Sequence, residues 1–177
     1  MDRAFNIFKK DIHLDYKKPN GFEELDSTSH FMCGRNVWVN PFVYNLINHS
    51  KDIVIAVQMW SYKDLKQLED DMSYYGIPVN SANANYLRDI EFLADTVHSQ
   101  VIYYPPAYVK KKFNADDAGE YLLNCPYLYR KKYAHCQVVF LHKKKRGDLQ
   151  LFYYYTDDAK EKIEKCIHKT AGMIRYQ

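Results

Sequence analysis

Alternation between apolar runs and polar breaks is clearest in three segments, each of which predicts a β-strand. Residues 53–60 form the strongest one, because the run is rich in Val and Ile, carries no charge and is bounded by polar residues. Residues 135–142 and 149–155 are two further strand-length runs, joined by the polar segment 143–148. Gly147 gives this segment the permissive backbone of a turn, so the two runs predict a long β-hairpin. Shorter runs predict strands at 35–39, 101–104 and 173–176.

Capping residues and helical periodicity predict two helices in the middle of the chain. Ser61 is placed to cap a helix that runs to about Tyr75, where Gly76 and Pro78 end it. Residues 81–99 predict a second helix, because their apolar residues recur at helical spacing and form one stripe. The stripe consists of Tyr86, Ile90, Leu93, Ala94 and Val97.

The C-terminal part of the chain predicts one more helix. Asp157 and Asp158 place negative charge at its positive N-terminal end, and Gly172 closes it. Its apolar stripe consists of Ala159, Ile163, Cys166, Ile167 and Thr170. Elsewhere, Pro41 suits the first turn of a short helix over 41–48, and the polar segment 110–119 is predicted to be a loop or a short helix.

Strands that mix with helices and close in a hairpin are typical of the α+β class. We therefore predict a single α+β domain over residues 1–177, with a mainly antiparallel sheet and helices packed on one face. A chain of 177 residues can bury a sizeable core without disulfides. No apolar run approaches the roughly 18 residues that a membrane-spanning helix needs.

Composition adds an uneven charge distribution and an excess of tyrosine. The first 100 residues carry 10 Lys and Arg against 14 Asp and Glu, whereas residues 101–177 carry 15 against 8. A basic C-terminal half can attract a phosphate backbone, an anionic membrane surface or an acidic protein. The 17 tyrosines fit half-buried surfaces and interfaces, because the ring is apolar and its tip is polar.

The predicted partner-binding surface combines the tip of the hairpin with tyrosines. Four consecutive cations occupy the turn: Lys143, Lys144, Lys145 and Arg146. Tyr153 and Tyr155 follow in the second strand, and Tyr104 and Tyr108 lie in the tyrosine-rich segment before it. Tyrosine and arginine are frequent hot-spot residues of protein interfaces. The alternative is structural: cations on an exposed turn also keep a protein soluble, and the tyrosines can pack on the sheet.

Candidate catalytic and metal-binding residues form no recognisable motif. The four cysteines, Cys33, Cys125, Cys136 and Cys166, lack the paired spacing of zinc sites, and no phosphate-binding or nucleophile motif occurs. His135 and His142 lie seven residues apart on a predicted strand, so they point to opposite faces. We therefore predict no catalytic residue, metal or cofactor. A hydrolase or phosphoesterase would need a pocket that gathers two of His98, His135, His142 and His168 with a carboxylate.

Three segments of the last 70 or so residues resemble small proteins of gut Bacteroidetes, many of them lipoprotein-like. The segments are Lys111–Asp116, Tyr129–Cys136 and Phe152–Lys162. The resemblance implies no activity and no site residues. It implies a bacterium in which small accessory proteins act by binding others, including as immunity partners of rival toxins.

The sequence thus predicts a non-enzymatic protein-binding module, of the immunity or accessory kind, that uses a basic, tyrosine-rich C-terminal surface. The alternative is a nucleic-acid-binding domain, whose affinity would fall steeply with salt. The N-terminus lacks the apolar stretch of a signal peptide, which predicts a cytoplasmic protein. A periplasmic or lipid-anchored protein is the alternative if an export signal precedes this sequence.

Overall fold

The computed structural model describes residues 3–25, 31–32, 38–39, 42–78, 81–94, 100–123 and 128–177. Its α-helices are α1 (Arg3–Asp11), α2 (Tyr62–Tyr74), α3 (Asn85–Leu93), α4 (Pro106–Phe113) and α5 (Ile163–Thr170). The strands are β1 (Leu14–Tyr16), β2 (Phe22–Glu24), β3 (Phe31–Met32), β4 (Trp38–Val39), β5 (Tyr44–Asn48), β6 (Ile53–Ser61), β7 (Ile102–Tyr103), β8 (Asp117–Leu122), β9 (His135–Lys143), β10 (Gly147–Tyr155) and β11 (Ile174–Tyr176). Short 3₁₀ turns occupy Ala82–Ala84, Asp157–Lys162 and Ala171–Met173.

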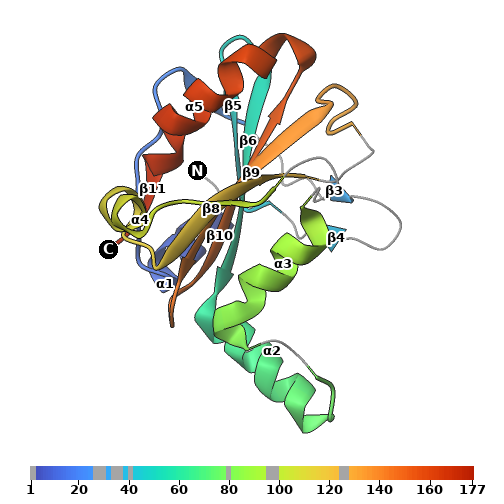
Figure 1. Cartoon of the computed structure of the whole chain (residues 1–177), viewed down its shortest axis with the longest axis vertical. Coiled ribbons are helices and arrows are strands. Elements are labelled where there is room, and N and C mark those ends of the chain that lie inside the picture. The colour runs from blue at the N-terminus through green and yellow to red at the C-terminus, as the bar shows by residue number, and fades with distance from the viewer. Residues whose placement is uncertain are drawn as a thin grey trace.

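A seven-stranded antiparallel sheet with the order β2-β5-β6-β10-β9-β8-β7 organises the molecule (Figure 1). Its three central strands, β6, β10 and β9, are nine residues long and pair along their whole length. All nine residues of β10 are buried, because the strand has neighbours on both sides and packing on both faces. β1 and β11 form a separate two-stranded ribbon, and β3 pairs with β4. The predicted α+β class with a mainly antiparallel sheet is confirmed.

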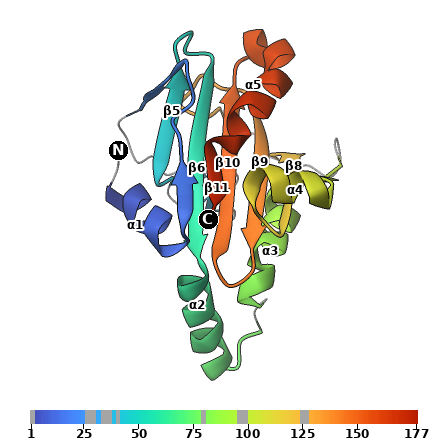
Figure 2. The ribbon, with the colours of Figure 1, turned by 90° about the vertical axis from the view of Figure 1, so that its left-hand side faces the viewer.

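The two faces of the sheet carry different layers (Figure 2). Helices α1, α4 and α5 and the β1–β11 ribbon cover one face, where their apolar residues join a core that includes Phe113, Ile163 and Ile174. On the opposite face α3 packs through Tyr86, Ile90 and other residues of its predicted stripe. Among the described helices, α1, α4 and α5 thus share one face, α3 packs on the other, and α2 extends beyond the end of the sheet (Figure 1).

Helix α2 begins where the sequence predicts, at the end of β6. The Ser61 hydroxyl accepts a hydrogen bond from the Asp64 backbone N–H at 3.1 Å, which is the geometry of an N-cap. Gly76 ends the helix with a φ of +68°, a conformation that glycine adopts without a steric cost. Leu65 is the one buried residue of α2. The helix therefore projects into solvent with little anchoring beyond its first turns.

The predicted hairpin of β9 and β10 is confirmed, and Gly147 has the role expected of it. Its φ is +152°, and a Cβ atom at this position would lie 2.1 Å from the carbonyl oxygen of Trp60 on β6. Glycine is thus needed both for the backbone conformation and for the close approach of the neighbouring strand. The final strand is also confirmed, as β11. The helix predicted before it is confirmed in part: residues 157–162 form a 3₁₀ turn, and the α-helix, α5, begins only at Ile163 and has no side-chain cap.

One prediction for the middle of the chain is wrong, and another is right only in part. The segment predicted as a helix over 41–48 contains strand β5, which pairs with β2 on one side and β6 on the other. Its side chains alternate between the two cores, with Tyr44 and Leu46 on one face, so burial on a sheet outweighs the local helix signal of Pro41. The polar segment 110–119 holds the end of α4 and the start of β8, a strand that the pattern did not indicate.

Other predicted elements agree in part or lie outside the described residues. The helix predicted over 81–99 is described as a 3₁₀ turn followed by α3, which ends at Leu93. Residues 95–99 are outside the described part of the chain. Of the strand predicted over 35–39, Trp38 and Val39 are described, as β4.

Candidate functional site

The basic turn of the hairpin is held against the rest of the protein. Lys143 forms an ion pair with Asp116 at 2.9 Å, and the backbone N–H of Lys144 donates to the other carboxylate oxygen of Asp116. The backbone N–H of Lys145 donates to the side-chain oxygen of Asn83. The carbonyl of Arg146 accepts from the N–H of Tyr62 at the start of α2. The turn is therefore a docked corner of the fold, from which the side chains of Lys144 and Lys145 reach solvent.

Tyr153 and Tyr155 are core residues, which corrects the prediction that they share a surface with this turn. Tyr153 is fully buried, and its hydroxyl lies 3.0 Å from that of Thr170 on α5. Tyr155 is at the end of β10 farthest from the turn. At about 3.4 Å per residue, a nine-residue strand separates the two ends by roughly 25 Å.

Tyr104, just before α4, and Tyr108, within it, are half-buried and pack against Phe113 at the end of the helix. The Tyr104 ring stacks on Phe113 and meets Tyr108 edge to face. Its hydroxyl donates to Glu120 at 2.7 Å. Burial first, and then the hydrogen bond to Glu120, raise the pKa of Tyr104 above its usual range. Packing explains these two rings. Tyr108 belongs to α4, whose last turn contains Lys110, Lys111 and Lys112.

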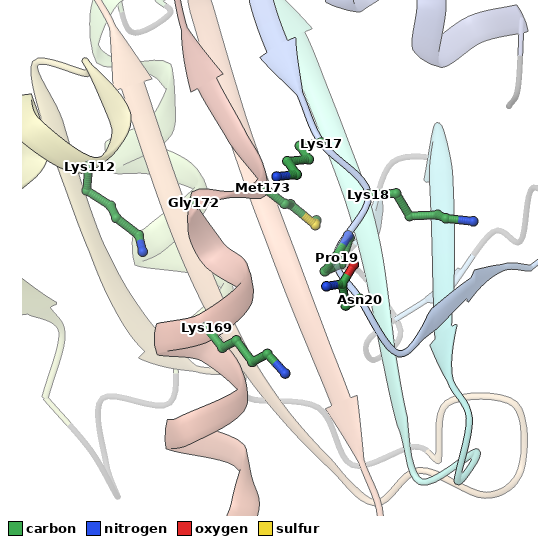
Figure 3. Close-up of a pocket in the computed structure, with 8 residues that line it drawn as sticks. All are labelled: Lys17, Lys18, Pro19, Asn20, Lys112, Lys169, Gly172 and Met173. Atoms are coloured by element: carbon green, nitrogen blue, oxygen red, sulfur yellow. The ribbon is translucent and has the colours of Figure 1, made fainter.

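The structure brings together lysines that are far apart in the sequence. A pocket of about 300 Å³, which we call the lysine pocket, lies where the end of β1, the end of α4 and the end of α5 meet (Figure 3). Its lining residues are Lys17, Lys18, Pro19, Asn20, Lys112, Lys169, Gly172 and Met173. Four of the eight are lysines and none is acidic. No spacing in the sequence indicates this site, since its parts come from three distant segments.

One backbone hydrogen bond and two from side chains hold the β1–β11 ribbon and α4 together beside the lysine pocket. The N–H of Lys17 donates to the carbonyl of Met173 at 2.8 Å, which continues the β1–β11 ladder by one residue. Arg175 on β11 donates to the carbonyl of Lys111 at 2.6 Å, and Asn114 donates to the carbonyl of Tyr176. The ribbon is thus tied to α4 beside the pocket.

Lys112 is positioned within the lysine pocket. Its ammonium donates to the carbonyl of His168 at 3.3 Å, near the end of α5. The side chain passes over Gly172, where a Cβ atom would lie 2.6 Å from the Lys112 Cε. The absence of a side chain at residue 172 therefore leaves the room that Lys112 occupies.

A second basic hollow lies at the other end of the β1–β11 ribbon. It has a volume of about 490 Å³ and is lined by Asn6, Lys9, Lys10, His13, Leu14 and Gln177. The N–H of Gln177 donates to the carbonyl of His13, which closes the ribbon at this end. Arg175 is exposed between the two hollows. We call the lysine pocket, Arg175 and this second hollow the basic face.

The described histidines do not gather in one place. His142 is buried with Asp148, Nδ1 to Oδ1 2.6 Å, and the ring of Tyr86 stacks on it at 4.4 Å. His135 is at the opposite end of β9, half-buried and paired with Asp157 at 2.8 Å. His168 is exposed on α5. His98 lies outside the described residues. Among the described histidines, the arrangement required for the hydrolase alternative is therefore not found.

The His142–Asp148 pair belongs to a buried polar cluster between α3 and the sheet. The Tyr86 hydroxyl donates to Asp117 at 2.9 Å, and Tyr121 donates to Gln150, whose amide approaches Asp89 at 3.3 Å. Burial raises the pKa of Asp148, although its hydrogen bond with His142 opposes this. The cluster fixes α3 on the sheet, on the face opposite the basic face.

Within the described residues, no three His, Cys, Asp or Glu side chains are placed to hold a metal ion. Cys136 and Cys166 are free thiols, and Cys33 and Cys125 lie outside the described part of the chain. Of the helices described, none has both the length and the apolar character needed to cross a membrane. Comparison of the chain with family models, curated proteins and solved structures finds no match.

Proposed function

We propose that the protein is a non-enzymatic binding module that holds an acidic protein partner on its basic face. The observation that carries this proposal is the lysine pocket, whose lining includes four lysines from three distant segments, while none of its described lining residues is acidic. Like charges repel when they are gathered, so such an arrangement gains most from a bound anion. The accessory or immunity role implied by the resemblance is one form that such binding could take.

A protein partner fits this face better than a nucleic acid does. Asp15 is exposed on β1 between the two hollows, where it would repel a continuous phosphate backbone. None of the described residues that line the lysine pocket is aromatic, and the second hollow offers only the His13 imidazole as a ring on which a base could stack. Separate carboxylates on a folded partner can reach each hollow and avoid Asp15.

The first test replaces Lys17, Lys18 and Lys169 by Gln and measures binding of a fluorescent decaglutamate peptide by anisotropy. Three exposed ion pairs at about 0.5 kcal/mol each predict a loss of affinity of roughly tenfold. The matched control replaces Lys63, Lys144 and Lys145, which are exposed at the hairpin turn and on α2, and so removes the same net charge. We expect the control to change the affinity by less than about twofold.

Equal losses in the two variants would mean that overall charge, and not this face, attracts the peptide. A labelled single-stranded oligonucleotide of equal charge serves as the second probe, across a series of salt concentrations. If it binds more tightly than the peptide, with an affinity that falls steeply with salt, the nucleic-acid alternative replaces the proposal.

A further inference from the structure

The charge within the lysine pocket exceeds what the fold itself can neutralise. The last turns of α4 and α5 both end beside the pocket, with Lys112 on one and Lys169 on the other. A helix C-terminus carries about half a negative charge, so the two ends together offset about one of the four ammonium groups. Helix capping therefore explains part of the arrangement, notably the bond from Lys112 to the carbonyl of His168. Figure 3 shows the Lys18 side chain directed away from the other three lysines, so about two positive charges remain for a ligand.

A phosphoryl group matches this excess better than a carboxylate. A phosphomonoester carries between about 1.5 and 2 negative charges at pH 7 and presents three acceptor oxygens, whereas a carboxylate carries one charge and two oxygens. Lys17, Lys112 and Lys169 come from three different elements around the pocket (Figure 3). The volume of about 300 Å³ lies at the lower end of the range for small-molecule sites, so a phosphoryl group can enter together with part of the side chain that carries it.

We propose that the lysine pocket binds the phosphoryl group of a phosphorylated side chain on the partner protein. This inference rests on the proposed function and names the chemistry of the partner. The non-lysine lining consists of Pro19, Asn20, Gly172 and Met173, which offers no ring for a nucleobase. Asn20 adds an amide that can donate to a phosphoryl oxygen. A phosphopeptide therefore fits the lining better than a nucleotide.

Gly172 provides a test that leaves the net charge unchanged. In the Gly172→Ala variant the new methyl group would lie 2.6 Å from the Lys112 Cε, closer than two carbon atoms can approach, so the lysine must move. The atom displaced is at the end of a flexible side chain, so we expect the fold to tolerate the change. The positioned ammonium is lost to the pocket while all four lysines remain.

The experiment is isothermal titration calorimetry of the full chain with three peptides that differ at one residue: phosphoserine, glutamate or serine. We expect the phosphoserine peptide to bind about tenfold more tightly than the glutamate peptide, because of its additional charge and oxygen. Gly172→Ala should remove most of this advantage and change the affinity for the glutamate peptide by less than about twofold. Lys112→Gln should act in the same direction, and Lys145→Gln at the hairpin turn is the control for charge alone.

Each other outcome has a distinct meaning. If the phosphoserine and glutamate peptides bind equally well and both lose affinity in the Lys17, Lys18 and Lys169 variant, the phosphoryl inference is overturned and the proposed function stands. If none of the peptides binds the folded protein, both are overturned. If inorganic phosphate binds as tightly as the phosphoserine peptide, the ligand of the pocket is free phosphate and not a phosphorylated protein. A single-stranded oligonucleotide that binds best, with sensitivity to Gly172→Ala, would assign the pocket to nucleic-acid phosphates.

Discussion

Replacing His142 by Ala is expected to lower the free energy of unfolding by about 3–5 kcal/mol, because it leaves the Asp148 carboxylate buried without its partner. Both side chains of the pair are almost fully buried, and they are hydrogen-bonded at 2.6 Å. The variant also removes the ring on which Tyr86 stacks. Urea denaturation followed by circular dichroism at pH 7 measures the change.

Two further variants separate the buried pair from other effects of losing a histidine. His135→Ala removes a histidine from the same strand that is also paired with an aspartate, but the Asp157 carboxyl is mostly exposed. Little change in stability is expected there, since exposed pairs contribute little. Replacing both His142 and Asp148 by Leu should recover much of the loss, because an apolar pair leaves no buried charge. If the double variant is as unstable as His142→Ala, volume and packing would be the cause.

Replacing Asp89 by Asn is expected to stabilise the protein at pH 8 by about 2–4 kcal/mol and to have little effect at pH 4. Burial raises the pKa of Asp89 to about 7; Arg88 opposes the shift, and the nearby Asp148 adds to it. In the unfolded chain the same carboxyl has a pKa of about 3.9. Over most of the range between about pH 4 and pH 7, the Asp89 carboxyl is therefore protonated in the folded protein and ionised in the unfolded chain.

The direction of the pH effect follows from that difference in proton binding. Below about pH 4 the carboxyl is protonated in both states and favours neither. As the pH rises toward 7, stability is lost progressively, because the unfolded chain ionises freely and the folded chain cannot do so without a cost. Asparagine keeps an oxygen that can accept from Gln150 and carries no charge, so this part of the pH dependence should disappear.

The measurement is the free energy of unfolding in urea at pH 4, 6 and 8 for the original chain and the variant. Glu91→Gln is the matched control, because Glu91 is exposed on the same helix and loses the same charge. If Asp89→Asn and the original chain show parallel curves, the carboxyl titrates normally. The polar cluster would then leave the docking of α3 insensitive to pH in this range.

The pattern of neighbouring residues was sufficient to predict an element where its local preference agreed with its place in the final sheet. The uncharged run of β6, the two runs of the hairpin and the cap at Ser61 were predicted from neighbouring residues alone. Strand β5 was not, because Pro41 favours a helix start, and the partners that hold β5 extended lie in β2 and β6. Strand β8 was missed for a similar reason: its residues are mixed in polarity, and pairing with β9 defines it.

The candidate site depends even more than the strands on contacts between distant segments, which the local sequence does not predict. Four adjacent cations made the hairpin turn look like a projecting surface, but Asp116 and Asn83 hold it in place. Tyr153 is seven residues from Arg146 in sequence, but it lies well along the extended strand β10 and is buried in the core. The lysine pocket depends on Lys17, Lys112 and Lys169, whose proximity follows from tertiary packing and not from any motif.

The β1–β11 ribbon also determines the stage of synthesis and folding at which the basic face can form. Its strands pair residues that are separated by almost the entire sequence, as in the contact between Asp15 and Gln177, 162 residues apart. Loop-closure entropy makes such long-range pairing late in folding. On the ribosome, the chain can build much of its sheet before residue 176 emerges, but it cannot form either basic hollow. The basic face can thus form only after residues 174–176 have been made and have paired with β1.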